Sequence, residues 1–504
     1  MKTIKIKYFV IALSIIAITV SCSTNFLDVK PSGTNLENAY YTNQAEAYSG
    51  LVAVYDLMRK SSGGFENEIA ILNAVSDDHY AGGGGSTDGV GIQAASSYTQ
   101  TGVTMPESYW SDYYQGISRA NYLLTKLPSI PMDAGLIARY TAETKALRAY
   151  YYFNLVRMFK NIPLITVPLT SDKFLSVPQA DPAAVYAQIE KDLTEAIVDL
   201  PATISLPTEA GRFSKGAAVA TLGKVYLTEG KKDLAATQLA LVNGTPGGTS
   251  QFGYKLLDNY NDLWVVSNKY NTESILETAH TSASNAGWGN WGSGSDEGNS
   301  LNVMVGPRGY TTPAVTTAPS LPSGWSFNPI TQDLYDAIKN DPRFGATVLD
   351  LKALKAAGQA DYIPGYMDTG YFLNKFTPRL ADVTTGGGDA VLNYKQDTYD
   401  IRLADTYLLE AEALGSTGAR AQALLDAVRA RVGLPSVPVS AATVATERRL
   451  ELAGEGHRFF DLVRTGQAAT VLASRGFVAG KSEIFPIPYL ELVNTQIKQN
   501  PGYN

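Results

Sequence analysis

Apolar residues recur at helical spacing through long stretches of this sequence. In the segment 133–159, the apolar positions that share one helical face include Leu147, Tyr150, Tyr151, Leu155 and Met158. The same period runs through the segments 42–60 and 106–127. We therefore predict long amphipathic helices in these segments, with their apolar stripes packed into a core.

The segment 215–242 carries the clearest repeat-like pattern. Leu222, Gly223 and Tyr226, followed by Ala235 and Leu239, match the tetratricopeptide pattern L-G-x2-Y…A-x3-F with leucine in place of phenylalanine. The small residues let two antiparallel helices approach closely, and the larger ones fill the groove between them. The segment 401–434 has the pattern of a second, degenerate pair. The predicted fold class is thus mainly α, a solenoid of tetratricopeptide-like helix pairs, whose usual role is a binding scaffold.

Three regions interrupt the helical pattern. Residues 76–104, 281–330 and 361–393 are rich in Gly, Ser, Thr and Asn with scattered aromatic residues. Long insertions of this composition in a compact domain are typically functional loops. We expect short strands and ordered loops, gathered on one face of the helical scaffold.

The N-terminus has the three parts of an export signal: lysines, an apolar run and small residues before Cys22. It resembles a bacterial lipoprotein signal, so we predict a signal peptide over 1–21, lipidation of Cys22, a tether over 22–36 and a single domain over 37–504. The acyl chains would place the protein in a membrane. A simple secretory signal with an incidental cysteine is the alternative.

Charge and residue counts exclude several classes of partner and cofactor. The formal net charge is −7, and removing residues 1–21 makes it more negative, which argues against a nucleic-acid partner. Cys22 is the only cysteine, so no disulfide can form within one chain. His79, His280 and His457 are too far apart to form a recognisable metal-binding pair, and we expect neither a metal nor a cofactor.

Enzyme motifs are weak in this sequence. Gly287, Gly289 and Gly292 form G-x-G-x-x-G, but the Gly- and Ser-rich residues that follow do not favour the helix that a dinucleotide site needs. The adjacent Asp77 and Asp78 diverge, whereas a glycosidase needs two carboxyls that flank one bond. Two carboxylates from distant segments could still meet in the fold. We therefore predict a non-catalytic protein, with a surface glycosidase as the alternative.

The C-terminal part contains long recognisable blocks. TERRLELAGEGHRFFDLVRTGQA, at 446–468, and FPIPYLELVNTQIKQNPGYN, at 485–504, resemble the terminal signature of the SusD/RagB family, the outer-membrane nutrient-binding lipoproteins of Bacteroidetes. The resemblance continues upstream through the helical blocks and the leader CSTNFLDVKPSG. It implies a non-enzymatic glycan-binding protein, lipid-anchored at the outer-membrane surface and exposed to the outside. The protein would act as a lid on a SusC-like TonB-dependent transporter.

The resemblance also implies that the helix pairs support an irregular, loop-rich ligand-binding region. In this family, the ligand surface is formed by an early loop and a middle insertion. The aromatic candidates here are Tyr80, Trp288, Trp291, Tyr310 and Trp325, and the polar candidates are Asp77, Asp78, His79, Asn285 and Asn290. Aromatic rings stack on the C–H faces of sugars, while polar side chains bind the hydroxyl rim. Trp110, Trp264 and His457 are expected to be packing residues. No basic cluster occurs in either loop, which favours a neutral glycan; peptide or protein cargo is the alternative ligand.

Overall fold

The computed structural model describes residues 40–61, 63–293 and 295–503. The predicted signal peptide, Cys22 and the tether lie outside these residues. The described chain is mainly helical, as the sequence predicts, and its strands are few and short. No helix within the described ranges is both long and apolar enough to cross a membrane.

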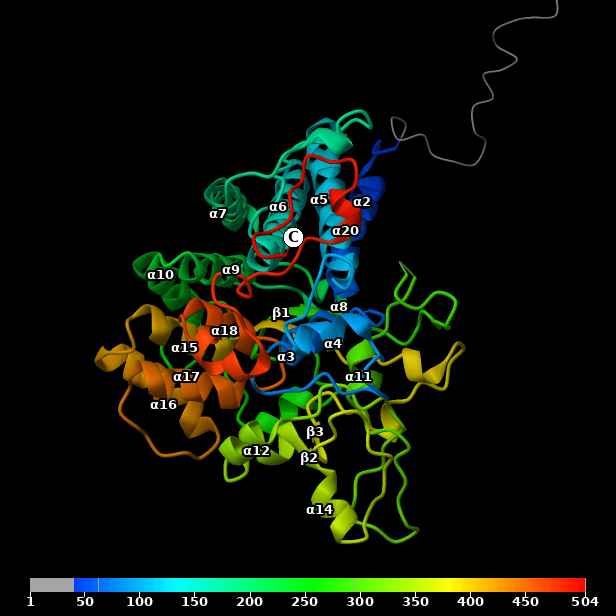
Figure 1. Cartoon of the computed structure of the whole chain (residues 1–504). Helices are drawn as coiled ribbons and strands as arrows, with labels where there is room; N and C mark the ends of the chain where they lie inside the picture. The colour runs from blue at the N-terminus through cyan, green and yellow to red at the C-terminus, as the bar shows by residue number, and fades with distance from the viewer. Residues whose placement is uncertain (1–39, 62, 294, 504) are drawn as a thin grey trace, which may run out of the picture.

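The long helices predicted from apolar periodicity are α2 (Gln44–Lys60), α5 (Ser108–Lys126) and α6 (Ala134–Phe159), which stand side by side in the upper part of Figure 1. Helix α6 is nearly all buried in its second half, where it carries a run of three tyrosines. These three tyrosines belong to the main hydrophobic core, so their burial contributes to the stability of the bundle.

Further helices extend this bundle in sequence order: α7 (Pro182–Asp199), α9 (Lys215–Thr228), α10 (Lys232–Asn243), α15 (Leu403–Ala413) and α16 (Gly418–Arg431). Each packs on the next, starting from α6. A Cβ on Gly223 of α9 would lie 2.7 Å from Leu239 Cγ of α10, so the glycine permits the close approach that the repeat pattern predicts. The tetratricopeptide assignment of these pairs stays a prediction.

The last part of the chain returns to the bundle. It contains α17 (Ala441–Glu451), α18 (Arg458–Arg464), α19 (Ala468–Val471) and α20 (Tyr489–Leu492). Near the end, the side-chain amide of Asn500 donates hydrogen bonds to the carbonyl oxygens of Phe159 and Phe485, both at 2.8 Å. The buried amide therefore fastens the C-terminal segment to the end of α6.

Short elements connect these helices, and α12, α14, β2 and β3 lie lowest in Figure 1. Strand β1 (Ser274–Thr278) pairs antiparallel with β4 (Thr398–Arg402), and β2 (Val348–Asp350) with β3 (Tyr371–Leu373). The short helices are α3 (Glu68–Ala74), α4 (Val90–Ser96), α8 (Leu206–Glu209), α11 (Ser300–Val305), α12 (Gln332–Ile338), α13 (Phe344–Thr347) and α14 (Leu351–Ala356).

Two of these short helices correct the expectation of strands and loops in the interrupted regions. Helix α4 lies within 76–104, and α11 lies within 281–330. Every residue of α11 is buried, and Asn302 donates to the Phe376 carbonyl oxygen and to Gln396 Oε1. Tertiary burial thus favours a helix here despite the glycine-rich flanks.

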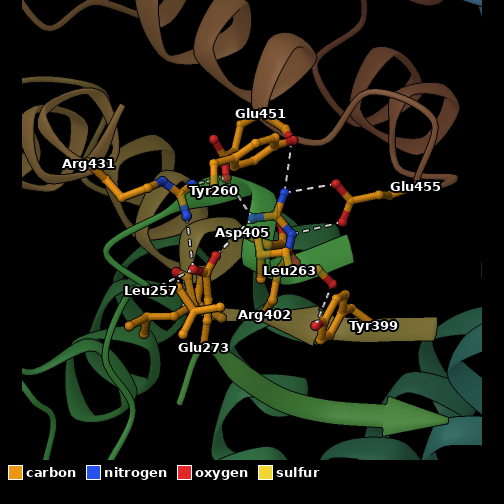
Figure 2. A network of polar contacts seen from close by, with 12 residues as sticks. Leu257, Tyr260, Leu263, Glu273, Tyr399, Arg402, Asp405, Arg431, Glu451 and Glu455 are labelled. Carbon is orange, nitrogen blue, oxygen red and sulfur yellow. Dashed lines mark hydrogen bonds and ion pairs between the residues drawn. The ribbon is translucent and has the colours of Figure 1, made fainter. Parts of the chain in front are cut away.

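A buried network of charges joins the short sheet to the C-terminal helices (Figure 2). Arg402 at the end of β4 pairs with Glu273 at 2.9 Å, with Glu451 at 2.6 Å and with Glu455 at 2.8 Å. Arg431 of α16 also pairs with Glu273, at 2.9 Å. The arginines hold the pKa of Glu451 well below its ordinary value, so this carboxylate stays ionised although it is buried.

Glu68, the first residue of α3, supplies a test of pH dependence. Burial raises the pKa of Glu68 to about 7, against the effect of the hydrogen bond from the Tyr113 hydroxyl. The folded pKa lies above the unfolded value of about 4.3. Protonated Glu68 therefore makes its full contribution to the free energy of unfolding below pH about 4. This contribution is lost as the pH rises through about 7.

We expect the free energy of unfolding of the wild-type protein to fall more steeply between about pH 4 and pH 7 than that of Glu68→Gln, because the amide cannot ionise. Urea unfolding at a series of pH values, followed by circular dichroism, measures both slopes. Parallel slopes for the two proteins would contradict this role of Glu68.

Candidate functional site

Four aromatic side chains from three separate segments meet at one place on the described surface. The ring centroids of Trp288 and Trp325 are 6.0 Å apart with an angle of 28° between the planes, and those of Trp325 and Phe65 are 5.2 Å apart with an angle of 18°. Trp291 lies edge-on to all three, with centroids 5.1 to 5.8 Å away. We call Phe65, Trp288, Trp291 and Trp325 the aromatic cluster.

The two tryptophans of the middle loop are held by local hydrogen bonds. Asn290 Oδ1 accepts from the backbone N–H of Gly287 at 2.7 Å, and Asp296 Oδ2 accepts from that of Gly292 at 2.8 Å. Asp389, from the third interrupted region, accepts from the backbone N–H of Trp288 at 3.3 Å. The glycine-rich loop is thus braced by side chains, which fixes the positions of its indoles.

Phe65 enters the cluster because two loops touch backbone to backbone. A Cβ on Gly64 would lie 3.2 Å from Gly292 Cα, and Gly64 has a φ of +59°, which disfavours any other residue. Phe65 was missed in the sequence because it lies outside the three interrupted regions. The signal that could have found it is SSGGF, in which a glycine directly precedes an aromatic residue, as Gly287 precedes Trp288 in the tryptophan loop.

The cluster is open to solvent on one side. Trp288 is 57% exposed and Phe65 is 39% exposed, while Trp291 and Trp325 are half-buried. Underneath, the ring of Phe65 contacts the buried Phe327 edge-on at 5.9 Å. Large apolar rings are rarely left exposed together, and such a group on a braced loop is typical of a binding surface.

The early loop differs from the prediction. Asp77 forms a two-point ion pair with Arg458, at 2.8 Å for each bond, and Asp78 accepts from Arg449 at 2.7 Å. His79 is fully buried with its Nδ1 3.0 Å from the Asn328 carbonyl oxygen, and burial lowers the pKa of the His79 ring to about 4. These three side chains fasten the loop to the body of the protein, so we leave them out of the proposed site.

The structure also differs from the prediction for Tyr310. Its ring is buried in a small apolar cluster with Leu349, Leu351 and Tyr362, and its hydroxyl donates to the Pro319 carbonyl oxygen at 2.6 Å. The interrupted region 281–330 needs a core of its own, and Tyr310 supplies part of it.

The remaining predicted residues lie in different surroundings. Asn285 is exposed beside the loop of Gly386 and Gly387, and it precedes Trp288 by three positions in the same loop. Asn290 is used inside its own turn, with its amide donating to Ser295 Oγ at 3.1 Å. Tyr80 lies away from the cluster, against the guanidinium of Arg475 at 4.9 Å.

The residues assigned to packing do pack. Trp110 is 2% exposed, and Trp264 lies in edge contact with Tyr260, Phe376 and Tyr399. Burial lowers the pKa of His457 to about 4, so its ring stays neutral at physiological pH. In the described ranges no three His, Cys, Asp or Glu side chains are grouped so as to hold a metal ion.

A helical scaffold with an exposed aromatic cluster on braced loops defines a binding protein. The chain belongs to the SusD family, whose model matches residues 272–483. A second family model, described as "Starch-binding associating with outer membrane", matches residues 25–227. Members of this family are binding proteins rather than enzymes, so both the family resemblance and the expectation of a non-enzymatic protein are confirmed.

Solved and curated relatives agree with this assignment. A "Laminarin binding SusD-like protein" is 68% identical, with a TM-score of 0.90, over 92% of this chain and 100% of that one. Surface glycan-binding protein A from Bacteroides thetaiotaomicron, solved in complex with laminarihexaose, has the same fold at 24% identity and a TM-score of 0.81, over 91% of this chain and 100% of that one. SusD-like protein P38 of Formosa agariphila is 24% identical over 96% of each chain.

Proposed function

We propose that this protein captures a neutral glucan of the laminarin type at the cell surface and holds it at the aromatic cluster. The observation that carries the proposal is the meeting of Trp288, Trp325 and Phe65 as near-parallel rings, of which Trp288 and Phe65 are exposed. The 68% identical relative is named for laminarin binding, which supports the same ligand class here.

The chemistry of the cluster suits a sugar polymer. A pyranose ring has a face of C–H bonds that stacks on an indole, and each such contact is worth about 0.5–1.5 kcal/mol beyond area burial. The polar groups at the rim include the exposed Asn285 and the carboxylate of Asp389, which can accept hydrogen bonds from sugar hydroxyls. Several moderate contacts of this kind fit reversible binding of a repeated unit.

Delivery is the second part of the proposal. Acyl chains on Cys22 would anchor the protein in the outer membrane through the tether 22–36, with the folded body outside. The protein would then close as a lid over a SusC-like TonB-dependent transporter and release the glycan into it. The family model that matches residues 25–227 is described as associating with the outer membrane, which supports this placement.

A binding screen tests the proposal. The chain from residue 23 onward, which includes all described residues, is run by affinity electrophoresis in gels that contain laminarin, starch, fructan, xylan or an anionic glycan. New reducing ends are assayed in matching mixtures. We expect retardation by laminarin without new reducing ends. Absence of retardation by every glycan would favour peptide cargo, and new reducing ends would revive the glycosidase alternative.

A further inference from the structure

A second hollow lies between the early loop and the third interrupted region, apart from the aromatic cluster. Its volume is about 750 Å³, and its wall includes Tyr80, Gln93, Ser96, Thr99, Tyr366 and Arg475. Hydroxyl, amide and guanidinium groups beside two tyrosine rings form a lining that suits a polyhydroxylated ligand. We call this hollow the tyrosine pocket.

Arg475 is fixed at the wall of the tyrosine pocket by neutral acceptors. One of its terminal nitrogens donates to the carbonyl oxygen of His79 at 2.8 Å and to Ser96 Oγ at 2.9 Å, and the guanidinium lies 4.9 Å from the centre of the Tyr80 ring. No carboxylate within the described ranges forms an ion pair with it, in contrast to the paired Arg449 and Arg458 close by. Its remaining N–H groups are therefore available as donors to a ligand.

Tyr366 also lines the tyrosine pocket, and its backbone is held by a close contact with the early loop. Its backbone N–H donates to the Gly83 carbonyl oxygen at 2.8 Å, and a Cβ on the preceding Gly365 would lie only 2.6 Å from that oxygen. The ring is 39% exposed. Because the backbone is fixed while the ring faces solvent, a ligand can stack on Tyr366 with little loss of side-chain entropy.

A groove joins the tyrosine pocket to the aromatic cluster. The groove has a volume of about 500 Å³ and is lined in part by Phe65, Val90, Thr104 and Tyr489. Phe65 also belongs to the aromatic cluster, while Val90 and Thr104 also line the tyrosine pocket. Cluster, groove and pocket are thus neighbours that share lining residues, and residues of α4 line both the groove and the pocket.

We infer that the tyrosine pocket is a second subsite for the same polysaccharide chain, which binds at the aromatic cluster and runs along the groove. This inference rests on the proposed function and makes it more specific: a chain long enough to reach both places uses the whole site, whereas a short oligosaccharide binds at the aromatic cluster alone. Two moderate contacts on one polymer strengthen each other, because binding at the second occurs at high effective concentration.

Isothermal titration of wild type and Tyr366→Ala against laminarin and against a four-unit oligosaccharide of the same linkage tests the inference. The matched control is Phe174→Ala, which removes a 59% exposed ring from another part of the surface. We expect Tyr366→Ala to weaken laminarin binding about fivefold to tenfold, the loss of one stacking contact of about 1 kcal/mol. Binding of the short oligosaccharide should be unchanged, and the control should bind both like wild type.

The outcomes separate the two proposals. Wild-type affinity of Tyr366→Ala for laminarin would overturn the second subsite while leaving the aromatic cluster intact. Equal loss for laminarin and for the oligosaccharide would overturn it as well, because the tyrosine would then act on the first site. Failure of the wild-type protein to bind either glycan would overturn the proposed function itself. Arg475→Gln, which keeps hydrogen-bond donors but removes the charge, should retain most of the laminarin affinity if the ligand is neutral.

Discussion

Replacing Trp288 and Trp291 together with alanine is expected to weaken laminarin binding by about a hundredfold, to the limit of detection in affinity electrophoresis. Loss of two indoles removes stacking worth about 1 kcal/mol each, together with the apolar area that they cover on the ligand. Trp288 contributes mainly as an exposed surface, and Trp291 mainly as the edge-on support of its neighbours. The double substitution therefore removes both the contact and its support.

The fold should survive this change. Trp288 is 57% exposed, and the loop is braced through backbone N–H groups of Gly287 and Gly292, which alanine does not affect. Thermal unfolding should show a midpoint close to that of wild type, and Phe174→Ala again serves as the control for loss of an exposed ring. A double variant that still binds laminarin with unchanged affinity would refute the aromatic cluster as the binding surface.

The largest effect on stability is expected for Arg402→Met. Arg402 is fully buried and compensates three carboxylates, those of Glu273, Glu451 and Glu455. Removing one partner of a buried ion pair leaves uncompensated charge in the interior, which costs about 3–5 kcal/mol. Other cations remain beside these carboxylates: Arg431 pairs with Glu273 and Glu451, Arg343 with Glu451, and Lys375 with Glu455. They keep part of the compensation, which places the expected loss within that range.

Urea unfolding at neutral pH measures this loss. The matched control is Lys339→Met, which breaks an exposed pair with Asp336 one helical turn away and should change the free energy of unfolding by less than about 1 kcal/mol. Similar small changes for both variants would show that the network in Figure 2 is dispensable. Where Arg402→Met remains folded, its laminarin affinity should equal that of wild type, because the network does not contribute to the aromatic cluster.

Helices were the part of the fold that could be predicted well. Apolar periodicity placed α2, α5, α6 and the pair α9–α10 within a few residues of their observed bounds, because a helix is specified by contacts three and four residues apart. The periodicity could not find α11, a helix of six buried residues in a glycine-rich region. Its formation depends on partners such as Phe376 and Gln396, more than seventy residues away.

The candidate site, too, could be predicted from the sequence only in part. The sequence by itself determined that Trp288, Trp291 and Trp325 lie in loops rather than on helical stripes, and composition and the family blocks determined the class of protein. Only the tertiary structure decided that Phe65 completes the cluster and that Asp77, Asp78 and His79 do not contribute to it. The reason is that Asp77 and Asp78 are neutralised by arginines 381 and 371 residues away in the chain, and no local pattern can show such a partner.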